Sequence, residues 1–190
     1  TPPYKQLRQS QGLEDAGTEP DLWPDASVFT DASSLTQVGT GAGKCLRFAV
    51  CNNQGVSQAS FYQGETAIFF YEFELLEPLE VPLTGVVLHN DRGIVVHGKG
   101  SLDHGNDVQF HLPAGTLIRC KQCIKLKLAM GEYTFELGLG SIDLESYQSR
   151  ATLGPERLFG RVHRICLVPT AGMFTVTLRS RVRRNESLLT

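Results

Sequence analysis

The sequence predicts an all-β protein, an antiparallel β-sandwich of the jelly-roll or immunoglobulin-like type with about eight strands. Short runs of β-branched and aromatic residues are separated by turn residues, and the chain has 19 glycines and 9 prolines. Within these runs apolar and polar residues alternate, as they do in strands with one face in a core. No window of comparable length keeps the apolar stripe of a helix, so strands and helices are not expected to alternate.

The chain divides into a linker or N-terminal arm, residues 1–42, and a sandwich domain, residues 43–190. The first part is polar, rich in turn residues and without sustained periodicity. Trp23 is the single tryptophan of the chain. It either pins the arm onto the sandwich or lies in a flexible linker. A start of this kind, without an initiator Met, is typical of a fragment cut from a longer protein.

Strand patterns follow one another from Cys45 onward. The run CLRFAV comes first and the long run TAIFFYEFELLE follows it. The runs LTGVVLHN and IVVHG are joined by residues 90–93, a hairpin turn in which Gly93 is expected to take a positive φ. Later runs are VQFHL, IKLKLAM, YTFELGL and FTVTLRS. Alternation predicts these core side chains: Ala67, Phe69, Tyr71, Phe73, Leu75, Val108, Phe110, Leu112, Ile124, Leu126, Leu128, Tyr133, Phe135, Leu137, Leu139, Phe174, Val176 and Leu178.

Composition excludes several classes of protein. The 190 residues include 18 Lys and Arg against 20 Asp and Glu, which gives a net charge of -2. Dedicated nucleic-acid binders carry a basic excess, so no nucleic acid is expected as a partner. No run approaches the roughly 18 apolar residues that cross a bilayer, and no signal peptide is recognisable. The five cysteines lack a framework spacing, which predicts free thiols in a reducing compartment, the cytosol.

Two motifs that resemble ligand sites fail on inspection. The run VGTGAGKC resembles a phosphate-binding loop, but Val38 replaces its first Gly and Cys45 replaces its Ser or Thr. A strand pattern also follows it where a helix is needed. Cys120 and Cys123 form a lone CxxC, and residues three apart in a strand face opposite sides. We therefore expect no nucleotide, cofactor or metal site.

Signatures of catalysis are also missing. A set of histidines suggests a cupin-like metal site, but such sites carry a close HxH pair that this sequence lacks. There is no GxSxG or cysteine-centred signature, and sequence does not give the separation of a glycosidase carboxylate pair. We expect a non-catalytic chain. The histidines in question are His89, His97, His104 and His111.

The order of elements between Phe61 and Leu139 is distinctive. Its parts are Gly64-Glu65 before a long aromatic strand, a strand and hairpin from Pro82 to Gly93, His97-Gly98, Pro113-Ala114-Gly115, and Gly131-Glu132-Tyr133 leading into a strand. In this order and spacing, residues 45–179 resemble the C-terminal domain of Wzt, the nucleotide-binding subunit of ABC transporters that export O-antigen polysaccharides. One segment differs, because after His97-Gly98 the family commonly has Thr and Asn where this sequence has Lys99, Gly100 and Ser101.

The resemblance implies a β-sandwich that binds the non-reducing end of a finished polysaccharide before its export. It also implies a homodimer in which the last strand is exchanged between protomers. An ATPase domain preceding residue 1 would connect such a domain to the membrane subunit of the transporter. The expected location is then cytoplasmic, at the inner face of the inner membrane. Similar domains also occur beside sugar-modifying transferases.

Outward-facing side chains supply the groups that hold a sugar, namely planar hydrogen-bonding groups and an aromatic face. Phe70 is expected to be exposed, with Glu74 on the same sheet face. Alternatively these side chains only solvate the sheet, and Phe70 with Ile68 belongs to a dimer interface or to the second sheet. The function is either carbohydrate recognition or an assembly module that dimerises the ATPase or docks a glycan-modifying enzyme. The candidate glycan-binding residues are Phe70, Glu72, His89, Gln109, His111 and Lys125.

Overall fold

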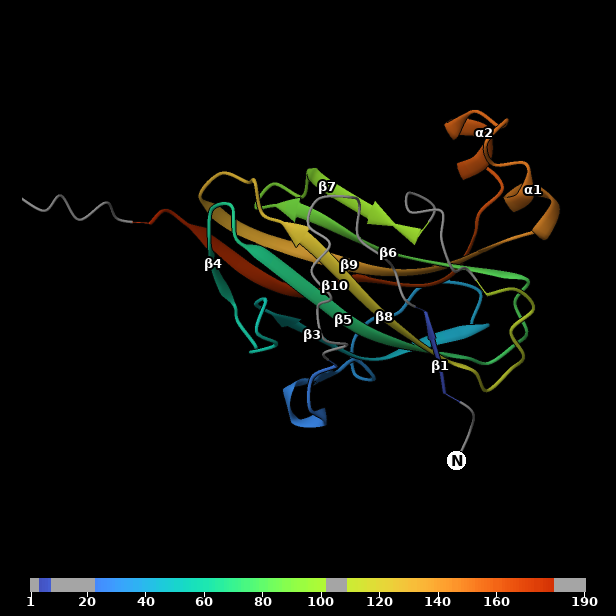
Figure 1. Cartoon of the computed structure of the whole chain (residues 1–190), viewed down its shortest axis with the longest axis horizontal. Helices are drawn as coiled ribbons and strands as arrows, with labels where there is room; N and C mark the ends of the chain where they lie inside the picture. Colours follow the sequence, from blue (N-terminus) through green and yellow to red (C-terminus); the bar gives the residue numbers. More distant parts are fainter. Residues whose placement is uncertain (1–3, 8–22, 102–108, 180–190) are drawn as a thin grey trace, which may run out of the picture.

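The structure, a computed structural model, describes residues 4–7, 23–101 and 109–179. Their strands form two five-stranded sheets that lie face to face (Figure 1). Sheet A has the order β1-β8-β5-β3-β2, and sheet B has the order β4-β10-β9-β6-β7. The prediction of an all-β sandwich is confirmed. The strands are β1 (Tyr4–Leu7), β2 (Thr30–Asp31), β3 (Gly43–Cys51), β4 (Ser60–Tyr62), β5 (Thr66–Leu75), β6 (Val81–Asn90), β7 (Val95–Gly100), β8 (Leu117–Lys125), β9 (Gly131–Ile142) and β10 (His163–Thr177).

Most neighbouring strands pair antiparallel, and the two exceptions involve short edge strands. β1 pairs parallel with β8, and β4 pairs parallel with β10. The longer strands inside each sheet form antiparallel ladders, which are continuous between β5 and β8 and between β6 and β9 and are interrupted by register shifts between β3 and β5 and between β9 and β10. Because side chains alternate between the faces of a strand, these registers decide which residues of neighbouring strands share a face.

The main core lies between the two sheets and is rich in aromatic rings. Phe69 of β5 contacts Phe135 of β9 and Phe174 of β10, with ring centroids 5.1 and 6.3 Å apart and the rings edge to face. The predicted inward set of β5, from Ala67 to Leu75, is at most 1% exposed. The inward set of β9 is buried as well. Alternation therefore located the core of both long strands correctly.

The turn between β6 and β7 also forms as predicted. Gly93 has a φ of 71°, a value that L side chains rarely adopt. The Asn90 side chain accepts hydrogen bonds from the backbone N–H groups of Arg92 and Ile94, at 3.0 and 2.9 Å. An Asn that bonds its own turn in this way favours the hairpin.

The predicted strand VQFHL does not form in its described part. Val108 lies outside the described residues, and residues 109–112 hold only an isolated bridge between Leu112 and Leu79. His111 has a φ of 53°, which breaks the alternation that a strand needs. Phe110 is consequently exposed and touches Tyr147. Leu178 is exposed too, since β10 ends before it.

Two short helices are inserted between β9 and β10, α1 (Leu144–Gln148) and α2 (Pro155–Phe159) (Figure 1). The side chain of Asp143 caps α1 by accepting a hydrogen bond from the N–H of Ser146, and proline begins α2. The helices pack on the ends of β6 and β9 through a separate apolar cluster. Helices of five residues each are too short to leave a periodic apolar stripe. Among the described residues, no helix has the length and apolar character needed to cross a membrane.

Candidate functional site

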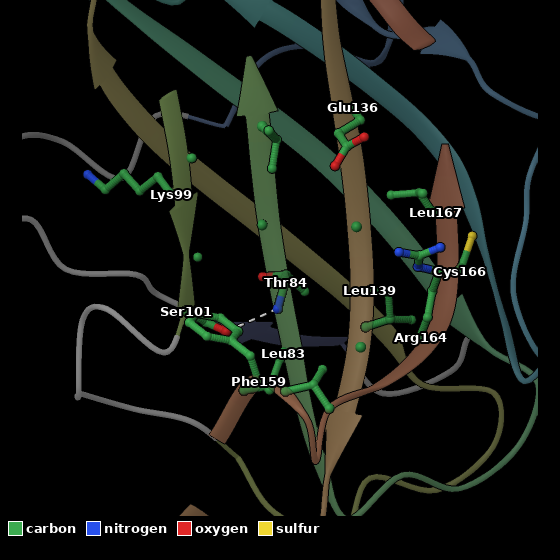
Figure 2. A pocket seen from close by; sticks show the side chains of 17 residues that line it. Leu83, Thr84, Lys99, Ser101, Glu136, Leu139, Phe159, Arg164, Cys166 and Leu167 are labelled. Carbon is green, nitrogen blue, oxygen red and sulfur yellow. Dashed lines mark hydrogen bonds between the residues drawn. The ribbon is translucent and has the colours of Figure 1, made fainter. Parts of the chain in front are cut away.

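The outer face of sheet B is hollowed into a cavity of about 620 Å³. It lies over β6, β7, β9 and β10, and α2 borders it (Figure 2). Cavities of this volume are typical of small-ligand sites. Five of the lining residues are glycines, a residue type that strands ordinarily disfavour. They are Gly85, Gly98, Gly100, Gly138 and Gly140.

The strand registers place three of these glycines in one row. Gly100 of β7 is paired with Gly85 of β6, and Gly85 is paired with Gly138 of β9. Gly138 is in turn paired with Leu167 of β10. A row without side chains therefore crosses three strands and ends at a leucine. We call this row and the two glycines beside it, Gly98 and Gly140, the glycine trench.

Side chains rise on both long sides of the trench. On one side Val87 and Glu136 are paired across β6 and β9, and on the other Leu83 is paired with Gly140. Phe159 at the end of α2 and Val162 also line this second side. Phe159 is 62% exposed, so one face of its ring is open to a ligand. The trench thus combines a bare floor, apolar walls and an accessible aromatic ring.

Two groups of opposite charge flank the end of the trench at Leu167. Figure 2 shows Glu136 and Arg164 on either side of Leu167. The carboxylate of Glu136 lies 3.9 Å from Nε2 of His89. Within the described part of the chain, no ion pair or hydrogen bond engages the exposed Arg164 guanidinium. A carboxylate that accepts and a guanidinium that donates are the planar groups that match sugar hydroxyls.

The outer face of sheet A is covered around Phe70, which corrects the expectation that this ring is exposed. Phe70 is 0% exposed, because Trp23 and Phe29 of the N-terminal arm lie over this face. The rings of Trp23 and Phe70 are 5.3 Å apart, edge to face. Trp23 thus lies against the sandwich, and Ile68 is buried in the same cluster. The apolar face of β5 that alternation assigned to solvent belongs under the arm.

Glu72 is likewise buried on sheet A, at 3% exposed. Its carboxylate accepts hydrogen bonds from Arg47 and from Nε of Arg119, the latter at 2.7 Å. Arg47 lies over the ring of Phe29 at 4.5 Å, and Arg119 lies over the ring of Trp23 at 4.9 Å. Glu72 therefore holds the arm in place. Lys125, on the same sheet, is exposed and does not line the trench.

Of the remaining predicted residues, the structure brings His89 to the rim of the trench, beside Glu136. Gln109 and His111 do not lie on a sheet face, because the segment 109–112 forms no strand. The predicted set is thus divided between two sheets and a loop. The expectation that these residues share one sheet face is wrong, since it assumed a strand at VQFHL and equated the outer faces of both sheets.

Sequence reasoning missed Glu136, Phe159, Arg164 and the glycines as site residues. A signal for the glycines was present. In the sequences Gly98-Lys99-Gly100 and Gly138-Leu139-Gly140, glycines recur at every second position, which places them on one face of a strand. Strand glycines often mark a place where a ligand or another backbone approaches closely. For Phe159 no periodic signal existed.

The cysteine pair lies as expected for a strand. Cys120 faces the core and Cys123 the opposite side. Burial raises the pKa of the Cys120 thiol to about 12, so this thiol stays protonated at neutral pH. In the described ranges, no three His, Cys, Asp or Glu side chains gather closely enough to hold a metal. His104 lies outside the described residues.

Comparison with known proteins agrees with this architecture. Residues 34–152 match the family described as the Wzt C-terminal domain. The fold is similar to the crystal structure of the C-terminal domain of Wzt, with a TM-score of 0.61 and 14% sequence identity over 77% of this chain and 80% of that chain. No curated protein matches the sequence significantly. Because the family match spans more than half of the chain, the chain belongs to the Wzt C-terminal domain family.

Proposed function

We propose that this chain is the carbohydrate-binding domain of an O-antigen ABC exporter and that it holds the glycan in the glycine trench. The observation that carries the proposal is the trench itself, with a bare floor, an open aromatic ring at Phe159 and planar polar groups at Glu136 and Arg164. Sugars present C–H faces that stack on aromatic rings and hydroxyls that bond to planar groups. The trench offers both kinds of contact side by side.

The choice of sheet B over sheet A follows from burial. The part of the outer face of sheet A around Phe70 is occupied by the arm, whose Trp23 and Phe29 cover that ring. A glycan could reach that face only after these contacts were broken. Sheet B, by contrast, carries the hollow on its outer face, over β6, β7, β9 and β10. The proposed glycan face is therefore the one that carries His89.

The role of such a site is selection before transport. A polysaccharide whose end fits the trench gains affinity for the exporter at the cytoplasmic face, where the ATPase subunits lie. Polysaccharides without that end gain no such affinity and are not exported. In this mechanism the domain forms and breaks no covalent bond. The same proposal includes that the recognised end is the non-reducing terminus of the polysaccharide.

One observation favours an additional role in assembly. The β6–β7 hairpin exposes three consecutive apolar residues, namely Ile94 just before the edge strand β7 and Val95 and Val96 at its start. Exposed apolar runs of this kind often mark protein contacts. An assembly module that dimerises the ATPase or docks a glycan-modifying enzyme remains the second candidate function. The exchange of a last strand between protomers is part of that candidate, and residues 180–190 at the end of the chain lie outside the described residues.

The test is a titration of the isotope-labelled domain with the O-polysaccharide of the cell that makes it, followed by amide chemical shifts. We expect saturable shifts around Gly85, Glu136 and Gly138. Phe159→Ala should weaken binding about tenfold, the effect of losing one stacking contact. Phe159 is exposed, so its loss should leave the fold intact.

Lys125→Ala is the matched control, since Lys125 is a candidate glycan-binding residue of the sequence that is exposed on sheet A and does not line the trench. It should bind the polysaccharide as the wild type does. Shifts that cluster around Lys125, or an absence of shifts at millimolar chain ends, would contradict the proposal. In the latter case, dissociation of a dimer by Val95→Asp, measured by light scattering, would support the assembly role.

A further inference from the structure

Within the described part of the chain, two glycines of the trench have no packing or backbone reason to be glycine. A Cβ built on Gly138 would meet nothing closer than Gly85 O and Leu167 Cδ1, both at 3.9 Å. A Cβ on Gly98 would meet only Val87 Cγ2, also at 3.9 Å. Both distances are ordinary van der Waals contacts, and neither residue has a positive φ. An alanine would therefore fit at both positions.

Gly140 and Gly85 of the trench, by contrast, leave little room for a Cβ atom. A Cβ on Gly140 would lie 2.9 Å from Val162 Cγ1, and one on Gly85 would lie 3.1 Å from the backbone oxygen of Lys99. Close packing explains these two. Gly98 and Gly138 are instead unfavourable choices for a strand, because glycine loses more backbone entropy on folding than alanine does. Among the described residues, nothing requires glycine at these two positions.

We propose that Gly98 and Gly138 keep the trench floor bare for a ligand, so that neutral sugar rings lie flat on the peptide groups and the glycan runs across the strands from β7 towards Leu167. This inference rests on the proposed function and adds the residues that set the shape, direction and charge of the ligand. A methyl group at Gly138 would stand in the middle of the floor, directly between Gly85 and Leu167. One at Gly98 would narrow the entrance beside Val87.

The dimensions of the trench suit a short length of glycan. From β7 to β10 there are three strand spacings, about 14 Å in all. Leu167, paired with Gly138, then closes the row on β10. On the β7 side, Gly98 is exposed and Gly100 continues the floor to the sheet edge. The chain end therefore meets Leu167, and the rest of the polymer leaves over β7.

The charges at the closed end favour a neutral sugar. Glu136 and Arg164 both line the cavity, so the end carries one carboxylate and one guanidinium. A uronic acid or a phosphorylated sugar would gain from Arg164 but would be repelled by Glu136, with which it would share a partly desolvated site. A neutral sugar can donate a hydroxyl to Glu136 and accept from Arg164 without either penalty.

The experiment compares wild type, Gly98→Ala, Gly138→Ala and Thr134→Ala in thermal melts and in titrations with fragments of the cell's O-polysaccharide of graded length. Thr134 is the control, because it lies on the outer face of β9 but outside the trench lining. Both glycine variants should melt at the wild-type temperature or about 1–4 °C above it. Gly138→Ala should bind the fragments at least tenfold more weakly than the wild type. Gly98→Ala should mainly lose the increase in affinity with fragment length, and Thr134→Ala should bind as the wild type does.

The outcomes separate this inference from the proposed function. If the wild type binds no fragment, the proposed function fails and this inference fails with it. If Phe159→Ala loses binding while Gly138→Ala binds normally, the proposed function stands and the bare floor is overturned. A marked drop in the melting temperature of Gly138→Ala would show that the glycine serves the fold, which also overturns it. A preference for acidic fragments would contradict the assignment of a neutral sugar.

Discussion

Gln122 of β8 donates a hydrogen bond from Nε2 to the backbone oxygen of Lys99 in β7, at 2.6 Å, and so joins the two sheets next to the trench. The Lys99 ammonium donates back to the oxygen of Cys123, at 2.9 Å. Tyr71 completes the network by donating its hydroxyl to Oε1 of Gln122. β7 is an edge strand with a single neighbour in sheet B. This network is therefore its second anchor, and it fixes the entrance of the trench.

Gln122→Leu should lower the free energy of unfolding by about 2 kcal/mol, because it leaves the buried Tyr71 hydroxyl and the Lys99 oxygen without this partner. Amide hydrogen exchange at residues 97–100 should become faster as β7 loosens. Chemical denaturation and exchange mass spectrometry measure the two effects. Gln63→Leu is the control, since Gln63 makes a similar bond to the oxygen of Leu128 at an exposed position. Equal losses in both variants would contradict the role of Gln122.

Glu72→Ala should destabilise the domain by about 3 kcal/mol, since it leaves two guanidinium groups facing each other without their shared carboxylate. Glu72 is 3% exposed, and both Arg47 and Arg119 bond to it. Glu74→Ala is the matched control two residues along the same strand. Its partner Lys44 is about half exposed, and such pairs contribute less than about 1 kcal/mol. Urea denaturation of both variants measures the two losses in unfolding free energy. Equal losses would contradict the role of Glu72, because they would mean that solvent screens its ion pairs as much as it screens that of Glu74.

Trp23→Ala should release the arm from sheet A while leaving the sandwich folded. The indole stacks on Phe29 and packs edge to face on Phe70. Its loss should cost about 2 kcal/mol and expose the apolar cluster beneath it. The readouts are dye binding to apolar surface and faster proteolysis between residues 24 and 42. Glycan binding in the trench should not change, because the arm covers the opposite sheet. Reduced glycan affinity in this variant would show that the two faces are coupled.

Alternation in β5 predicted one face correctly and misread the other. Its inward residues are buried as expected, but the opposite face is buried too, apart from its ends. A period-two pattern tells which residues share a face and not what lies against that face. The cover over Phe70 comes from Trp23, some 47 positions earlier in the chain, in a segment without any periodic signal. Long-range contacts of this kind cannot be derived from the pattern of a single strand.

The trench could not be predicted from the sequence for a related reason. Its floor depends on the pairing of Gly100 with Gly85 and of Gly85 with Gly138, which are registers between three strands. Each glycine alone has many explanations in a sequence, from turns to bulges. The strand predicted at VQFHL was wrong for a different reason. Its apolar and polar residues do alternate, but the backbone of His111 takes a positive φ, which a strand does not accommodate. His89 reached the site because its neighbours in β6 alternate regularly.

The buried thiols predict that stability falls as the pH rises above about 8.5. Burial raises the pKa of Cys120 to about 12 and that of Cys51 to about 11, whereas in the unfolded chain a thiol titrates near 8.5. Between these values the folded state holds protons that the unfolded state has lost. Unfolding then releases protons, so raising the pH favours it, by up to about 1.4 kcal/mol per pH unit for each thiol. At neutral pH both states are protonated and the effect vanishes.

Cys120→Ala should therefore flatten the decline of the unfolding free energy between pH 9 and pH 11, even though it lowers stability at pH 7 by removing a buried side chain. Val86→Ala serves as the control, because Val86 is equally buried and does not ionise. It should lower the whole curve and leave its slope unchanged. Urea denaturation at intervals of half a pH unit gives both slopes. A Cys120→Ala curve that runs parallel to the wild type would mean that the thiol ionises as readily in the folded core as in the unfolded chain.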